Sequence, residues 1–405
     1  MLINFRGVTA VGNIGTSVCD LYFHLKFSFY THGSFIPHAD AIMPSILKPS
    51  LLNPLFTGPL YYALTEAPMH VRVPLLVGLS KILSEETIER IITGLKWLTV
   101  LGLLRKTSSF LSELGQNNWR LRSEKHRYNW PSEIAVVTGA AGGFGKLLCA
   151  GLAKKGVKVI AVDVAAQMPP EVRNLRKINY YQVDITDPEA VKALGERVRA
   201  EHGNPSILIN NAGIAYTHTV LAAKPESLEK IFKVNIISHY YLLQAFLPAM
   251  VEQKKGHIVS VSSMAAYITP VALSPYCATK AGVLSLHEGL GTELRTVYKA
   301  PEVKLTIVHP TFAETAMVGA NAQNLKKARM RVLKPEEVTD AILKQIFAGR
   351  GRHIVLSPPA NWISTIKGWP GWLSQSLLQL PERRMDTSAM PAGFATTEIA
   401  QGKRT

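Results

Sequence analysis

Cysteine is scarce in this sequence. Its 405 residues include three cysteines, Cys19, Cys149 and Cys277, which are too few and too scattered for a disulfide framework or a metal site. We therefore expect reduced thiols in a reducing compartment and no bound metal. Cys277 lies next to Tyr276, but no His or Asp stands at a spacing that would make the thiol a nucleophile, so we expect Cys277 to pack in the core.

Long hydrophobic runs are also missing. The strongest, residues 91–104, is shorter than the roughly 20 residues that a membrane-spanning helix needs. It contains Lys96 and Trp97 and ends at a basic pair, which suits a helix lying in a membrane interface; a buried helix packed on the main domain is the equal alternative. No secretory signal follows Arg6, because Gly, Thr, Asn and Cys interrupt the apolar stretch.

A concentrated charged patch is the third absence. The formal charge is +16, but it divides into about +5 before Pro131, about +8 from there to Gly351 and about +3 after it. Diffuse basicity gives no nucleic-acid footprint, and no nucleic acid is predicted as a partner. It is compatible with an anionic ligand or membrane surface, and equally with a merely basic soluble protein.

The composition divides the chain into four parts. An apolar, membrane-associated extension is predicted for residues 1–115, a linker for 116–130, the main domain for 131–357 and a tryptophan-rich segment for 358–405. Trp362, Trp369 and Trp372 in the last part suit either an interfacial anchor or a lid over a hydrophobic cleft. The end of the chain, after Pro381, is polar, and we expect it to be disordered.

The main domain alternates short apolar strands with helices. Strands are expected at residues 133–137, 157–162, 180–183, 206–209, 257–262, 303–308 and 352–356, with helices such as 146–155 and 189–201 between them. Alternation of this kind predicts parallel pairing with right-handed crossovers and a sheet covered on both faces. The expected fold is therefore α/β, a Rossmann-like, doubly wound parallel sheet of about seven strands.

A glycine-rich turn, Thr-Gly-Ala-Ala-Gly-Gly-Phe-Gly from Thr138 to Gly145, follows the first strand and opens a helix. Glycines leave room for a pyrophosphate, and the helix amino end offers free amides and a positive dipole. Asp163 ends the second strand, where its carboxylate could bond both ribose hydroxyls and repel a 2'-phosphate. NAD(H) is therefore predicted over NADP(H), although Lys146 keeps the phosphorylated cofactor open.

Tyr276 and Lys280 stand four residues apart, on one face of a helix. An ammonium near a phenol favours the phenolate, so we expect Lys280 to lower the pKa of Tyr276 from about 10 towards neutrality. Such a tyrosine can transfer protons at physiological pH. Alone, the pair would read as two exposed side chains on a surface helix.

These motifs resemble the classical short-chain dehydrogenase/reductase family. The turn at 138–145, Asp184, the run Asn210-Asn-Ala-Gly213, Asn235, Ser263 and Tyr276-Cys-Ala-Thr-Lys280 occur in the family's order and spacing, across residues 134–356. Glycosyl hydrolases, kinases and metal enzymes would need carboxylate pairs or ligand clusters that the sequence does not offer.

The resemblance implies a role for each matching residue. Tyr276 would be the general acid and base, and Lys280 would also hold the nicotinamide ribose. Ser263, favoured over Ser262 by its spacing, would bond the substrate oxygen, and Asn235 would hold a relay water unless it is an ordinary helix-interior asparagine. The expected cofactor-binding residues are Thr138, Gly139, Gly143, Phe144, Gly145, Asp163, Asp184, Asn211, Ala212, Gly213, Tyr276, Lys280, Pro310 and Thr315.

One position departs from the family pattern. Thr311 follows Pro310 where classical members carry glycine, so the cofactor loop must accommodate a side chain. With the apolar extension and the tryptophan-rich tail, this variant resembles the membrane-associated retinol dehydrogenase and 17-beta-hydroxysteroid dehydrogenase type 11 branch. That likeness implies membrane association facing the cytoplasm, at the endoplasmic reticulum or a lipid droplet, with a cytoplasmic protein as the alternative. The family also implies a homodimer.

The function that follows is an NAD(P)(H)-dependent oxidoreductase interconverting an alcohol and a carbonyl on a lipophilic substrate such as a retinoid, a steroid or a long-chain lipid. Residues 315–336, which mix apolar and basic side chains, would form the substrate lid. A reductase of soluble 3-ketoacyl or polyketide-type thioesters and a non-catalytic NAD-binding scaffold are the alternatives.

Overall fold

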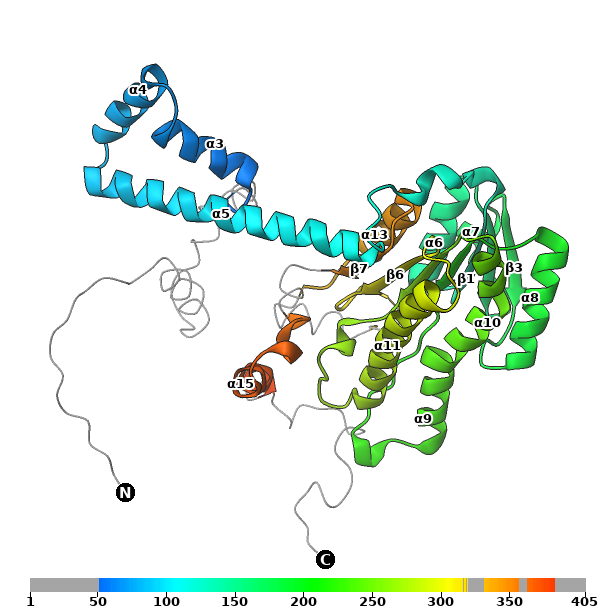
Figure 1. The fold of residues 1–405 in the computed structure, drawn as a ribbon. Coiled ribbons are helices and arrows are strands. Elements are labelled where there is room, and N and C mark those ends of the chain that lie inside the picture. Colours follow the sequence, from blue (N-terminus) through cyan, green and yellow to red (C-terminus); the bar gives the residue numbers. More distant parts are fainter. Residues whose placement is uncertain (1–50, 316, 318, 320–330, 357–362, 383–405) are drawn as a thin grey trace, which may run out of the picture. The chain divides into compact units, whose positions relative to one another are not determined.

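The computed structural model describes residues 51–315, 317, 319, 331–356 and 363–382. The chain forms two compact units, Met1–Ser112 and Glu113–Thr405 (Figure 1). Several predictions concern residues outside the described ones: Cys19, Trp362, the centre of the expected lid and the polar end of the chain.

The described part of the first unit is helical. α3 (Pro54–Thr65) begins at Asn53, whose side chain accepts a hydrogen bond from the Leu55 amide at 3.2 Å, and a proline follows at the first helical position, as helix starts favour. α4 (Met69–Ser80) comes next. The predicted 14-residue apolar run lies within a far longer helix, α5 (Glu85–Gln116), because polar helix formers such as Glu86, Arg105 and Lys106 extend it at both ends.

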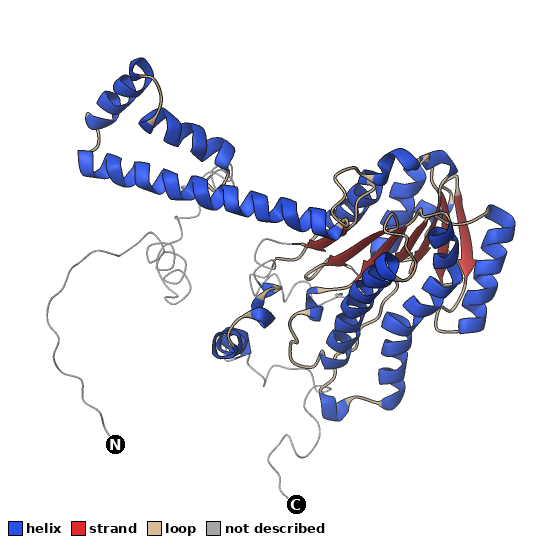
Figure 2. Cartoon of the chain, in the orientation of Figure 1, coloured by secondary structure: helices blue, strands red, loops and turns tan. Residues whose placement is uncertain are grey.

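The second unit is built on one parallel sheet of seven strands in the order β3-β2-β1-β4-β5-β6-β7 (Figure 2). The strands are β1 (Ile134–Thr138), β2 (Lys158–Asp163), β3 (Ile178–Gln182), β4 (Ile207–Asn210), β5 (His257–Val261), β6 (Lys304–His309) and β7 (Arg352–Val355). The predicted Rossmann-like doubly wound sheet is confirmed. The strand order reverses between β1 and β4, the point where such folds bind ligands.

Helices cover both faces of the sheet, and an apolar core lies between the sheet and the helices on each face. Successive β1 residues face opposite cores: Ala135 and Val137 pack beneath α6 and α13, and Ile134 and Val136 pack beneath α8, α10 and α11, as the two-residue period of a strand requires. These helices are α6 (Gly143–Lys154), α8 (Pro188–His202), α10 (Ser238–Glu252), α11 (Ser274–Thr296) and α13 (Pro335–Ala348).

Short elements complete the second unit. They are η1 (Glu124–Arg127), η2 (Trp130–Ser132), α7 (Pro170–Arg173), η3 (Val220–Ala222), α9 (Pro225–Phe232), η4 (Lys233–Ile237), η5 (Met264–Ala266), η6 (Ile366–Gly368) and α15 (Gly371–Glu382). Within the predicted linker, Tyr128 and Trp130 stack with ring centroids 5.0 Å apart, and Trp130 meets Phe347 of α13 edge-on at 5.0 Å. Trp119, by contrast, is 68% exposed.

Among the described residues, one helical stretch is long and apolar enough to cross a membrane by length and composition. It is Pro225–Glu252, which joins α9, η4 and α10. Much of it packs on the sheet, with Leu242 and Phe246 in the core, so the helix serves the interior of the second unit.

Candidate active site

The turn between β1 and α6 can be built only with glycine at two positions. Gly139 has a φ of +63°, and a Cβ there would lie 2.9 Å from the Ala212 Cα. A Cβ on Gly145 would lie 2.0 Å from the Gly139 carbonyl oxygen. The turn is therefore compact, and Gly142, the N-cap of α6, carries no side chain that could occupy the helix amino end.

Hydrogen bonds tie this turn to the loop after β4. The Thr138 hydroxyl accepts bonds from the amides of Asn211 and Ala212, both at 3.1 Å. The Asn211 side chain donates in return to the carbonyls of Thr138 at 2.9 Å and Gly139 at 3.2 Å. Residues predicted from two separate motifs thus meet at the point where the strand order reverses.

Asp163 reaches the same turn from the end of β2. Its Oδ2 accepts a hydrogen bond from the Ala141 amide at 2.9 Å, and its Oδ1 accepts one from the Ala165 amide at 3.1 Å. A carboxylate has about four acceptor sites, so it can hold the turn and still accept bonds from a ligand. Asp184 is exposed, and its Oδ1 accepts two bonds from Thr186.

The structure distinguishes the two serines after β5. Ser262 is buried, and its hydroxyl donates to the Lys280 carbonyl at 3.0 Å, a purely structural contact. Ser263 is half-buried and caps η5, accepting from the Ala265 amide at 3.2 Å. A hydrogen bond between Ser263 and the Tyr276 side chain lowers the pKa of that phenol. The spacing argument for Ser263 therefore agrees with the geometry.

Tyr276 and Lys280 lie together in the first two turns of α11. The Lys280 ammonium is 5.6 Å from the centroid of the Tyr276 ring and donates to the Val261 carbonyl at 3.0 Å. Burial lowers the pKa of Lys280 to about 8.

The expected lowering of the Tyr276 pKa by Lys280 is wrong for this structure. Burial raises the pKa of Tyr276 to about 12, and this outweighs the opposing hydrogen bond with Ser263. The physical reason is that tyrosine and lysine share one desolvated pocket, where the environment disfavours the charged form of each.

Asn235 is fully buried in η4, a single turn of π-helix. Its amide accepts from the Ile214 amide and donates to the Ile214 carbonyl, both at 2.9 Å, and donates to the Thr279 hydroxyl at 3.0 Å. A Cβ on Gly213 would lie 3.4 Å from the Lys280 ammonium and 3.5 Å from the Asn235 Oδ1. Asn235 and Lys280 thus flank Gly213. Single π-turns inside helices are frequent at functional sites, and nothing in the sequence predicted this one.

The loop after β6 contacts both the segment after β5 and the glycine turn. The Pro310 carbonyl accepts from the Met264 amide at 3.0 Å. The Thr315 methyl lies 3.7 Å from where a Cβ on Gly143 would stand, so Thr315 reaches the glycine turn. Thr311 keeps a buried hydroxyl without a hydrogen-bond partner. Phe144 packs its ring on the core beneath α6, which leaves its backbone for any ligand contact.

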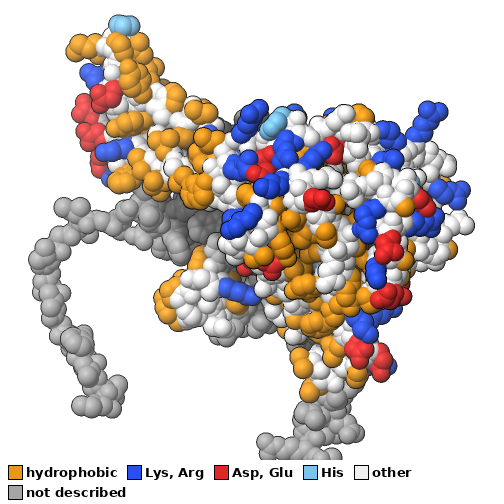
Figure 3. Space-filling view, turned by 45° about the vertical axis from the view of Figure 1, so that its right-hand side comes forward, with side chains coloured by type: hydrophobic (Ala, Val, Ile, Leu, Met, Phe, Trp, Pro, Cys, Tyr) orange, Lys and Arg blue, Asp and Glu red, His pale blue; other side chains and the backbone are white. Residues whose placement is uncertain are grey.

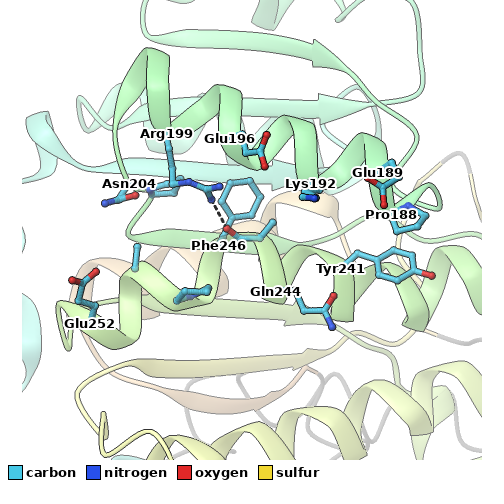
Figure 4. Close-up of a pocket in the computed structure, with 14 residues that line it drawn as sticks. Pro188, Glu189, Lys192, Glu196, Arg199, Asn204, Tyr241, Gln244, Phe246 and Glu252 are labelled. Atoms are coloured by element: carbon cyan, nitrogen blue, oxygen red, sulfur yellow. Dashed lines mark hydrogen bonds between the residues drawn. The ribbon is translucent and has the colours of Figure 1, made fainter.

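A groove on the surface of the second unit lies away from these residues. This groove of about 730 Å³ runs between α8 and α10, crossed by the Arg199 guanidinium, which donates to the Ala245 carbonyl at 2.8 Å (Figure 4). None of the predicted site residues lines this groove. Across the described part of the chain, no group of His, Cys, Asp or Glu side chains is arranged to hold a metal ion.

The sequence of this chain resembles those of several known proteins. The sequence model described as short chain dehydrogenase matches residues 133–326. The chain is 36% identical over 214 residues to Dehydrogenase RED2 of Cochliobolus heterostrophus, covering 52% of this chain and 78% of that protein. It is 32% identical over 228 residues to Estradiol 17-beta-dehydrogenase 11 of Homo sapiens (55% and 74%) and 34% identical over 231 residues to Epidermal retinol dehydrogenase 2 of Mus musculus (55% and 74%).

Solved structures agree on the fold. A short-chain type dehydrogenase/reductase from Mycobacterium marinum superposes with a TM-score of 0.51 at 25% identity, covering 56% of this chain and 95% of that one. A short-chain dehydrogenase from Streptomyces avermitilis superposes with a TM-score of 0.52 at 23% identity, covering 62% and 95%.

Proposed function

This chain belongs to the short-chain dehydrogenase family and is an oxidoreductase that interconverts alcohols and carbonyls with NAD(H) or NADP(H), and we propose that its substrate is lipophilic and that Tyr276 is its general acid and base. One observation carries the proposal: Ser263, Tyr276 and Lys280 gather at the carboxyl end of β5, with Gly213 beside Lys280 and the glycine turn hydrogen-bonded to the same loop.

The proposed mechanism assigns one task to each side chain. In carbonyl reduction Tyr276 donates its phenolic proton to the substrate oxygen, and in alcohol oxidation it receives that proton. Ser263 bonds the same oxygen and orients it. A pKa of about 12 keeps Tyr276 neutral at physiological pH, the form that donates a proton in carbonyl reduction. Alcohol oxidation needs the phenolate, whose share of Tyr276 rises with pH. Lys280 would hold the nicotinamide ribose, and a water beside Asn235 would connect Lys280 to solvent.

The glycine turn fits the pyrophosphate of a dinucleotide, since any side chain at Gly139 or Gly145 would collide with backbone. When bound, the nicotinamide would supply or accept the hydride. Thr138, Gly143, Asn211, Ala212, Pro310 and Thr315 would line its cleft, and Asp184 would contact the adenine.

We further propose a preference for NAD(H). Asp163 supports it, because its carboxylate is held at the glycine turn by the Ala141 amide and would repel a 2'-phosphate. The test is a comparison of Michaelis constants for the two cofactors. A lower constant for NAD⁺ is expected, and a clear preference for NADPH would contradict the assignment.

The proposal of a lipophilic substrate is supported by exposed apolar side chains in three segments: after β4, before α11 and after β6. These exposed residues are Val220 (73%), Leu221 (66%), Val271 (44%) and Met317 (50%), and Trp372 of α15 is 74% exposed. Figure 3 shows hydrophobic side chains gathered on the lower part of the second unit. Large exposed apolar patches mark ligand or membrane contacts.

Membrane contact is part of the same proposal. α5 exposes Trp97 (52%), Leu101 (52%) and Leu104 (62%), at spacings that place them on one face of the helix. We propose that the protein associates peripherally or monotopically with a membrane of the endoplasmic reticulum or a lipid droplet, faces the cytoplasm and acts as a homodimer.

The direct test is a panel of sterols, retinoids and long-chain alcohols with purified protein in detergent, following NADH formation by absorbance. Turnover of at least one lipophilic alcohol is expected. Activity confined to soluble acyl thioesters with NADPH would instead favour the 3-ketoacyl reductase alternative. Cofactor binding with no turnover of any compound would favour a scaffold.

A further inference from the structure

Two histidines and a tyrosine form a cluster behind Ser263. His309 is the last residue of β6 and is fully buried. His353 of β7 pairs with Ile307 of β6. Because His309 lies two residues after Ile307, the side chains of His309 and His353 lie on the same face of the sheet. The imidazoles stack with centroids 4.6 Å apart, and the Tyr267 ring, at the end of η5, lies 4.9 Å from that of His309.

These three side chains are joined in a line that ends on Ser263. His309 Nδ1 lies 3.0 Å from the Ser263 carbonyl oxygen. His309 Nε2 lies 3.4 Å from the Tyr267 hydroxyl, which lies 2.6 Å from His353 Nε2. The three residues come from separate elements, and none of them belongs to the motifs that identify the family.

The directions of these hydrogen bonds follow from which atoms can donate. A carbonyl oxygen only accepts, so the proton of His309 is on Nδ1, and Nε2 of the neutral ring is then an acceptor. The Tyr267 hydroxyl has one proton, and all three contacts are hydrogen bonds when that proton points to His309 Nε2. His353 Nε2 in turn donates to the Tyr267 oxygen. In this arrangement the hydrogen bonds run in one direction, from His353 to Tyr267, from Tyr267 to His309 and from His309 to the Ser263 carbonyl.

The surroundings keep this arrangement neutral. Burial, helped by nearby His353, His287 and Lys280, lowers the pKa of His309 to about 3, against the opposing bond to Ser263. Burial also lowers the pKa of His353, and it raises the pKa of Tyr267 to about 12, with Glu288 of α11 adding to the effect. A neutral ring carries one proton and one acceptor nitrogen, as the directed chain requires.

We propose that His309, oriented by Tyr267 and His353, is a positioning residue that fixes Ser263 for contact with the substrate oxygen. The inference rests on the proposed function, in which Ser263 bonds that oxygen. Several bonds join the end of β6 to the segment after β5. His309 Nδ1 donates to the Ser263 carbonyl, and the Pro310 carbonyl accepts from the Met264 amide at 3.0 Å and from the Ser263 hydroxyl at 3.4 Å. Reactive side chains need support of this kind, because a small displacement costs much of the rate.

Two substitutions of His309 by an amide side chain distinguish the loss of the hydrogen bond to Ser263 from a change in packing. In His309→Asn the side-chain amide can stand where Nδ1 stands and still donate to the Ser263 carbonyl. In His309→Gln the amide stands near the position of Nε2, so the bond to Ser263 is lost. With retinol or estradiol as the probe alcohol, we expect His309→Gln to lower kcat about tenfold with KM changed less than about twofold, and His309→Asn to stay within about threefold of wild type.

The third variant, Tyr267→Phe, removes one hydroxyl and leaves the bond to Ser263 in place. We expect a loss in kcat of about threefold, smaller than that of His309→Gln. Equal kcat for His309→Asn and His309→Gln, at equal melting temperatures, would overturn the proposal. So would a loss seen only in KM.

A spectroscopic measurement decides the hydrogen-bond chain without any substrate. Nitrogen-15 spectra of histidine-labelled full-length protein, assigned through His309→Asn, should show His309 as the Nδ1–H tautomer with no titration near neutral pH. Tyr267→Phe should shift the Nε2 resonance and leave Nδ1 in place. An Nε2–H tautomer would overturn the chain. If the wild type turned over none of the panel alcohols, the proposed function would fail, while these spectra would still decide the contact between His309 and Ser263.

Discussion

At the scale of single residues, Lys280 is a costly side chain to bury. It is 3% exposed, it makes no ion pair within the described ranges, and its ammonium has one hydrogen bond, to the Val261 carbonyl. A buried, unpaired charge destabilises a fold. Lys280 therefore opposes stability, and its place beside Tyr276, with the proposed contact to the cofactor, would explain its presence.

The first prediction concerns Lys280→Met. The folded-state pKa of about 8 lies below the usual 10.5, so the destabilisation is fully present below about pH 8 and fades as pH rises towards about 10.5, where the unfolded chain also loses the proton. We expect Lys280→Met to raise the free energy of unfolding at neutral pH by about 1–3 kcal/mol and to abolish turnover.

Urea denaturation at neutral and alkaline pH measures this effect. The stability gain should shrink as the wild type loses its buried charge. A variant less stable than wild type at neutral pH, or a gain independent of pH, would show that the buried ammonium is not destabilising.

The sequence predicts which residues form the catalytic group, but not which distant residues pack against it. Ser263, Tyr276 and Lys280 were found because they share one stretch of chain and a known spacing. The chain from His353 to Ser263 was not found, because Tyr267 lies 42 residues from His309 and 86 from His353, and only the register of β6 and β7 brings them together. The pKa of Tyr276 was predicted in the wrong direction, because spacing reports a neighbouring charge and says nothing of burial.

At the scale of elements, the glycine turn shows how local geometry shapes the site. Gly142 and Gly145 lie in the same turn, but a Cβ on Gly145 would strike the Gly139 carbonyl, whereas a Cβ on Gly142 would meet nothing within 4 Å. Gly142 also has a φ of −133°, which any residue can adopt.

The second prediction compares alanine at these two glycines. Gly145→Ala should destabilise the protein by more than about 3 kcal/mol, because the turn must open to admit the methyl group. Gly142→Ala should change stability by less than about 0.5 kcal/mol. Chemical denaturation of both variants provides the measurement. Similar losses in the two would mean that the turn is not as tightly packed as described.

The seven strands were predictable because apolar runs alternate with helical stretches, and their observed limits differ from the predicted ones by a few residues. α5 was not predictable as one helix, since hydropathy marks only its 14-residue centre. The π-turn at Asn235 depends on packing between α9, α10 and α11, which has no signature in the order of the residues.

At the scale of the whole molecule, the chain joins an oxidoreductase unit to a helical unit with apolar surface. The exposed apolar side chains on α5 would be unfavourable in water if nothing covered them. The proposed membrane surface would cover them and would also concentrate a lipophilic substrate.

The third prediction tests this role. The triple variant Trp97→Gln, Leu101→Gln, Leu104→Gln should weaken binding to vesicles of phosphatidylcholine and phosphatidylserine by at least about a hundredfold, since each side chain contributes about 1.5–3 kcal/mol when buried. Ser109→Gln, an exposed polar change on the same helix, is the control. Flotation with the vesicles measures binding. Equal flotation of the triple variant and the control would remove α5 from the membrane contact.

The proposed mechanism requires Tyr276 to transfer the proton. The direct measurement is turnover of the best panel alcohol by wild type and by Tyr276→Phe, together with NADH binding by fluorescence. We predict that Tyr276→Phe, which lacks only the hydroxyl, loses about 10²–10⁴-fold in kcat while its NADH affinity stays within about threefold of wild type. Turnover that survived the substitution would contradict the assignment of Tyr276 as general acid and base.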